Sequence, residues 1–136
     1  MIQLFSSNAF SQAEKTTGTL TFRVTGFETN SGQAILLLYR PGDDVPKKPF
    51  LRIMAEILNK ESVISLKDLP YGDYAVIIVH DQNKNGIIDH KWGMPAEPLG
   101  YTNGWKLSLF SGMPNFEKLK FSYSEPGNRV LIKMND

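Results

Sequence analysis

The residues best suited to chemistry lie in one short segment of the chain, between positions 81 and 89. Short oxygen-bearing side chains alternate around a glycine in this segment: Asp81, Asn83, Asn85 and Asp89, with Gly86 among them. Carboxylate and amide oxygens at alternating positions are typical of a loop that wraps around Ca²⁺, and the glycine makes the sharp bend that wrapping requires. The sequence therefore predicts a Ca²⁺ site in this loop.

The rest of the expected ligand shell is incomplete. Ile87 follows the glycine and would offer its backbone carbonyl, but Trp92 stands at the twelfth position, where a helix-flanked Ca²⁺ loop carries a bidentate glutamate. Glu97 is the nearest carboxylate downstream and would fold back to complete the shell. Because only two local ligands are charged, we expect a weak site, with a dissociation constant of about 10⁻⁴–10⁻³ M.

Two other interpretations of the segment need no Ca²⁺. Asn85-Gly86 is a favoured hairpin turn, although a turn alone does not explain four oxygen-bearing residues at alternate positions. His80 and His90 flank the loop and would bind a transition metal together with Asp81 or Asp89. A hydrogen-bonded histidine at a strand end and an exposed one explain the pair more simply, because their separation is not a typical zinc spacing.

Catalysis has little support in the sequence. Asp89 and Glu97 would form an acid–base pair in a hydrolase, but no nucleophile elbow, phosphate-binding loop or dinucleotide glycine pattern accompanies them. We therefore expect a protein that is not an enzyme.

Aromatic residues form a second group of candidates, around the long segment that follows the loop: Trp92, Tyr101, Trp105, Phe110 and Phe116. Exposed rings would stack on sugars or anchor a peptide or partner protein, so Trp92, Tyr101 and Trp105 are candidate contacts for an unknown glycan or protein ligand. The alternative is that these rings pin the segment over one end of the fold.

Composition excludes several classes of partner. The chain of 136 residues has a formal net charge of +1, and its basic residues are scattered, so a nucleic-acid interface is not expected. No apolar run is long enough to span a bilayer. The absence of cysteine excludes disulfides and thiolate metal sites.

Short segments of alternating or continuous apolar residues must position these candidates. Strands are expected over residues 18–25, 34–39, 51–58, 63–67, 74–80, 118–123 and 130–134. In the third of these, Ile53, Met54, Ile57 and Leu58 also satisfy helical spacing. The run 34–39 is apolar throughout, which indicates a central strand covered on both sides. A tight turn is expected over 68–73 and a long loop over 91–115. The pattern predicts an all-β, antiparallel β-sandwich of about seven strands with one long loop.

The chain divides into an arm and one domain. Residues 1–17 are expected to be a flexible N-terminal arm or the remnant of a signal peptide, and residues 18–136 the β-sandwich domain. Met1–Phe5 is followed by small residues that end in Ala13, a pattern typical of a cleavage site before Glu14. A frayed polar arm explains the same residues, because a basic n-region and a full apolar stretch are missing.

Several motifs together resemble an uncharacterised family of bacterial secreted proteins. The matching segments are Leu69–Val76, His80–Asp89, Gly93–Glu97, Gly100–Asn103 and Pro114–Glu117. The resemblance runs from about Gly18 to the C-terminus. It implies an immunoglobulin- or prealbumin-like sandwich and export across the inner membrane, to the periplasm or beyond. It implies no activity.

Overall fold

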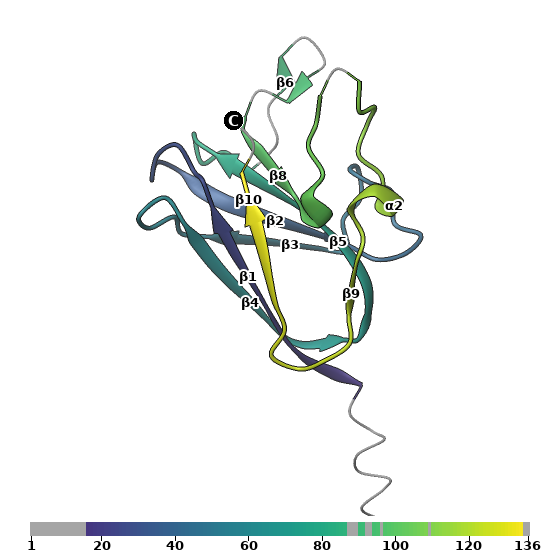
Figure 1. Cartoon of the computed structure of the whole chain (residues 1–136). Coiled ribbons are helices and arrows are strands. Elements are labelled where there is room, and N and C mark those ends of the chain that lie inside the picture. Colours follow the sequence, from purple (N-terminus) through teal and green to yellow (C-terminus); the bar gives the residue numbers. More distant parts are fainter. Residues whose placement is uncertain (1–15, 87–89, 92–93, 96, 109, 135–136) are drawn as a thin grey trace, which may run out of the picture.

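Alternating apolar residues build the smaller of the two sheets, whose central strand is β1 (Thr17–Thr25) (Figure 1). The computed structural model describes residues 16–86, 90–91, 94–95, 97–108 and 110–134. In β1, every second side chain from Leu20 to Val24 is fully buried, as the alternation predicts. β1 pairs antiparallel with β4 (Ser62–Pro70) and parallel with β10 (Arg129–Lys133).

The larger sheet has five strands, in the order β3, β2, β5 and β8, with β9 beside the start of β5. Their bounds are β2 (Gln33–Tyr39), β3 (Leu51–Ala55), β5 (Gly72–Asp81), β8 (Leu99–Tyr101) and β9 (Phe121–Tyr123). Every pair in this sheet is antiparallel. The remaining elements are short: β6 (His90–Lys91), β7 (Met94–Pro95), the 3₁₀ turn η1 (Thr102–Gly104) and α2 (Phe116–Leu119).

Two hydrophobic clusters lie on opposite faces of the larger sheet. The first fills the sandwich and joins side chains of both sheets, such as Phe22, Leu36 and Ile78. The second lies on the outer face and joins Leu37, Ile77 and Leu119, with Trp105 packed against it. β2 and β5 are therefore covered on both sides, which confirms what the unbroken apolar run of β2 predicts.

The all-β sandwich is confirmed, but several details differ from expectation. The pair of β1 and β10 is parallel, and ten short strands are present in the described part of the chain rather than about seven. β4 continues to Pro70, so only Tyr71 separates it from β5 where a turn over 68–73 is expected. Leu69 pairs with Gly18 and is buried, so the strand resumes after an irregularity at Asp68, which adopts φ +55° where the register of β1 and β4 shifts.

The segments after position 91 hold two further corrections. β8 lies within the expected long loop and is too short to show a periodicity. The expected strand over 118–123 begins only at Phe121, because residues 116–119 form one helical turn. The Asn115 side chain caps that turn by accepting a hydrogen bond from the Lys118 N–H at 2.9 Å.

Candidate functional site

The candidate site lies where β5 ends, at two consecutive buried polar residues. His80 and Asp81 are both fully shielded from solvent. His80 Nε2 lies 2.8 Å from the Ser31 carbonyl oxygen, and its ring meets the Phe27 ring edge-on with centroids 5.2 Å apart. These contacts agree with the hydrogen-bonded, structural interpretation of His80. The side chain of His90 lies outside the described residues.

Asp81 organises the loop that follows it. Its Oδ2 accepts hydrogen bonds from the Gly86 N–H and from Gln33 Nε2, both at 2.8 Å, and its Oδ1 accepts one from the Asn85 N–H at 3.2 Å. Asn83 Oδ1 accepts from the same Asn85 N–H at 3.2 Å. The two oxygens therefore lie close together, on a loop that closes back on Asp81. Gly86 adopts φ +76°, which favours glycine there.

Glu97 reaches the same place from 16 positions further along the chain. It is 8% exposed, and its Oε2 accepts a hydrogen bond from the Gln82 N–H at 2.9 Å. Its carboxyl group is also within hydrogen-bonding reach of the Asp81 carboxyl group. Two buried carboxyl groups in contact repel each other when both are ionised, so the pair must share a proton or hold a cation.

The electrostatics of Asp81 favour its charged form. Burial raises the pKa of the Asp81 carboxyl group, but the hydrogen bonds from Gln33, Gly86, Asn85 and Glu97 outweigh burial and hold the pKa below its ordinary value. A carboxylate that is buried, ionised and held by several donors is arranged as metal-ligating carboxylates are.

The structure brings together part of the predicted ligand set. The side chains of Asp81, Asn83 and Glu97 and the backbone N–H of Asn85 meet in one loop region, whereas Ile87 and Asp89 lie outside the described residues. Within the described part of the chain, no three His, Asp or Glu side chains gather closely enough to hold a metal ion. Among the described residues, amide and backbone oxygens are the groups that can add to Asp81 and Glu97 in a ligand shell.

Two residues that support the site were missed in the sequence. Gln33 anchors Asp81 from the neighbouring strand, and its signal is one polar residue at the start of an apolar strand. Gly32 adopts φ +74° and lies so close to β5 that an added Cβ would stand 2.1 Å from the Asp81 carbonyl oxygen. No sequence pattern distinguishes this glycine from an ordinary turn glycine.

The aromatic candidates are positioned for packing. Tyr101 is buried, and its ring meets that of Trp105 edge-on at 4.7 Å. Trp105 packs against the second cluster, with the Lys118 ammonium 5.8 Å from its ring centroid. This geometry fits the alternative in which the rings pin the segment in place. Trp92 lies outside the described residues.

One large aromatic residue of the same segment faces solvent. Phe110 is 96% exposed, and Met113 nearby is also exposed. All three residues are aromatic, but Tyr101 and Trp105 pack against the strands whereas Phe110 is exposed to solvent.

The family of the chain follows from its sequence. Residues 22–130 match the family described as "Uncharacterized protein conserved in bacteria" (DUF2141). The chain belongs to the DUF2141 family. The match spans the Asp81 loop and Glu97. That the motifs around them are characteristic of the family stays a prediction. Searches of curated proteins and of solved structures gave no match. No described helix of this DUF2141 protein is long and apolar enough to cross a membrane.

Proposed function

We propose that this DUF2141 protein is a non-catalytic, exported β-sandwich module whose Asp81 loop binds Ca²⁺. The observation that carries the proposal is the meeting of the buried Asp81 and Glu97 carboxyl groups. A divalent cation between them would remove the repulsion and draw on the amide oxygens of Asn83 and Asn85. Ile87 and Asp89 are the further ligands expected from the spacing of the loop.

The finer parts of the proposal rest on the sequence. Export to the periplasm or the cell exterior is supported by the N-terminal pattern before Glu14 and by the family resemblance. The resemblance also supports an immunoglobulin- or prealbumin-like arrangement of the sandwich. In this setting Ca²⁺ orders the loop, and its binding stabilises the fold.

Thermal unfolding with Ca²⁺ and with a chelator tests the cation site. Because Ca²⁺ binds only the folded state, it should raise the free energy of unfolding by about 2.7 kcal/mol at a hundredfold excess over its dissociation constant. For a domain of this size, that corresponds to a rise in Tm of several degrees. Identical transitions in the two conditions would remove Ca²⁺ from the proposed function.

The variant Glu97→Gln sharpens the test, because it separates a cation from a shared proton. With chelator, the variant should be about as stable as the parent, since a side-chain amide at position 97 can donate to Asp81 as the protonated carboxyl group does. With Ca²⁺, it should lose most of the stabilisation that the parent gains. Glu117→Gln is a matched control, because Glu117 is exposed and forms only a surface ion pair with Lys120. A full Ca²⁺ response in Glu97→Gln would contradict the proposed ligand set.

A further inference from the structure

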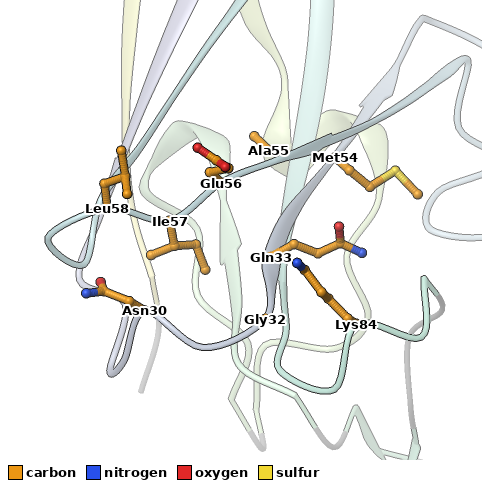
Figure 2. A pocket seen from close by; sticks show the side chains of 9 residues that line it. All are labelled: Asn30, Gly32, Gln33, Met54, Ala55, Glu56, Ile57, Leu58 and Lys84. Carbon is orange, nitrogen blue, oxygen red and sulfur yellow. The ribbon is translucent and has the colours of Figure 1, made fainter.

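A hollow lies beside the Asp81 loop, where β2 and β3 separate. The pairing of these strands ends at Ala34 and Ala55, and the chain segments on either side then diverge. The hollow has a volume of about 350 Å³, at the small end of the range for small-molecule pockets. Figure 2 shows the side chains that line it, among them Asn30, Gln33, Met54, Ile57, Leu58 and Lys84.

Lys84 supplies a positive charge to the hollow. Its backbone adopts φ +56°, a left-handed conformation that is unfavourable for a lysine. Figure 2 shows its ammonium group reaching toward Gln33 and into the space between the diverging segments. Among the described residues, Lys84 takes part in none of the three ion pairs, which join Arg23 to Glu61, Arg40 to Asp43 and Lys120 to Glu117.

The other groups in the hollow divide into amides and apolar side chains. Asn30 has its Oδ1 fixed by the Lys60 N–H, whereas Gln33 uses one Nε2 hydrogen on Asp81 Oδ2 and so keeps one N–H to donate and its Oε1 to accept. Met54 and Leu58 expose 46% and 66% of their surfaces. The Glu56 carboxylate also borders the hollow, but Figure 2 shows it turned away from Lys84, and Glu56 borders a second hollow as well.

We propose that this hollow binds a small carboxylate ligand with an apolar body. Its carboxylate pairs with the Lys84 ammonium and accepts the remaining Nε2–H of Gln33, while its carbon chain runs toward Asn30 and lies against Met54, Ile57 and Leu58. The ammonium, the one free Gln33 N–H and the apolar wall are then all matched. The hollow adjoins the proposed Ca²⁺ shell, because Lys84 lies in the Asp81 loop between Asn83 and Asn85 and Gln33 donates to Asp81.

Titration of the ¹⁵N-labelled protein with hexanoate, followed by backbone amide shifts, tests the proposal. Because Lys84 lies in the Asp81 loop, the titration is run with Ca²⁺ and again with chelator, and the thermal test of Ca²⁺ binding is read separately, so that failure of one proposal is distinguished from failure of the other. Hexanoate should shift the amides of Gln33, Ala55 and Lys84, and uncharged hexanamide should bind about tenfold more weakly, because it lacks the charge that pairs with Lys84. Equal binding of the two compounds, shifts at other residues, or no shifts would overturn the proposal.

Two substitutions locate the charge. Lys84→Met keeps the length of the side chain and should weaken hexanoate binding about tenfold, while Lys84→Arg should preserve it. Lys60→Met is the matched control, because Lys60 also has positive φ, at +62°, on the neighbouring turn but does not line the hollow. A loss of affinity in Lys60→Met equal to that in Lys84→Met would show general electrostatic attraction instead of a built site.

Discussion

At the scale of single residues, Asp81 shows how a buried carboxylate can be held in its charged form. Four donors surround it: the amide groups of Gln33, Asn85 and Gly86, and the carboxyl group of Glu97. The first three donors are neutral N–H groups, and their hydrogen bonds to Asp81 need no cation. The contact with Glu97 is different, because one of the two carboxyl groups has to change its protonation state or find a counterion.

The lowered pKa of Asp81 leads to a prediction about acid stability. A carboxyl group whose pKa is lower in the folded state contributes stability above its unfolded pKa, and this contribution is lost as pH falls through the folded pKa. In chelator, the free energy of unfolding of the parent should therefore fall below about pH 4. Asp81→Asn should be less stable near neutral pH and should show a shallower acid slope in denaturant titrations. Equal slopes would contradict this role.

The sequence predicts part of the residue-scale picture. The alternating oxygen-bearing side chains predict that Asp81, Asn83 and Asn85 converge, because the geometry is local to the loop. The return of Glu97 is expected only as the nearest downstream carboxylate. The contribution of Gln33 depends on the pairing of β2 with β5, a contact between distant parts of the chain that no local pattern encodes.

At the scale of elements, β10 shows the two faces of a strand most clearly. Ile132 is 1% exposed and belongs to the inner cluster, whereas its neighbour Leu131 is 70% exposed. Alternation predicts such strands well, because their side chains point to opposite faces in turn. It cannot predict that β10 lies parallel to β1, since direction depends on the path of the chain between them.

This contrast gives a matched pair of substitutions. Ile132→Ala should lower the free energy of unfolding by about 2–5 kcal/mol, because it leaves a cavity in the inner cluster. Leu131→Ala removes an aliphatic side chain of the same size from the same strand, but should change stability by less than about 0.5 kcal/mol. Urea unfolding of both variants measures the difference. Similar losses in the two would show that the faces of β10 are assigned wrongly.

Assignment of strands from apolar alternation is wrong at two places, where a helix cap or strand pairing decides the local structure instead. Residues 118–123 alternate with the period of a strand, yet the Asn115 cap starts a helical turn over 116–119 that places Leu119 in the outer cluster. β8 has only three residues, and its pairing with β5 across Ile77 to Val79 defines it as a strand.

At the scale of the whole molecule, the larger sheet carries a second layer of cover. On its outer face, Leu37 and Ile77 are covered by side chains from the residues between β8 and the end of α2: Trp105, Leu107, Phe116 and Leu119. Thr102 fastens this cover. Its Oγ1 accepts from the Val76 N–H at 3.0 Å and donates to the Leu119 carbonyl at 2.6 Å, and the residue is 1% exposed.

Loss of this fastening should destabilise the protein. Thr102→Val keeps the shape of the side chain but leaves a buried N–H and a buried carbonyl without their partner, which should cost about 1–3 kcal/mol. Thr102→Ser retains the hydroxyl group and should recover most of that loss. Urea unfolding in a Trp92→Phe background, in which fluorescence comes from Trp105 alone, measures the change at the cover itself. Unchanged stability in Thr102→Val would mean that packing alone holds the segment.

The parallel pairing of β1 with β10 also determines how the molecule can be held. Thr17 begins β1 opposite Pro70, at the far end of the sandwich from the Asp81 loop, whereas Met134 follows β10 and bridges to Gly100 near that loop (Figure 1). If the protein were attached to a surface through the N-terminal end of β1, the Asp81 loop and the hollow lined by Lys84 would face away from that surface. Attachment through the C-terminal end of β10 would place both close to the surface. A tag or surface linker used in binding assays therefore belongs before Thr17.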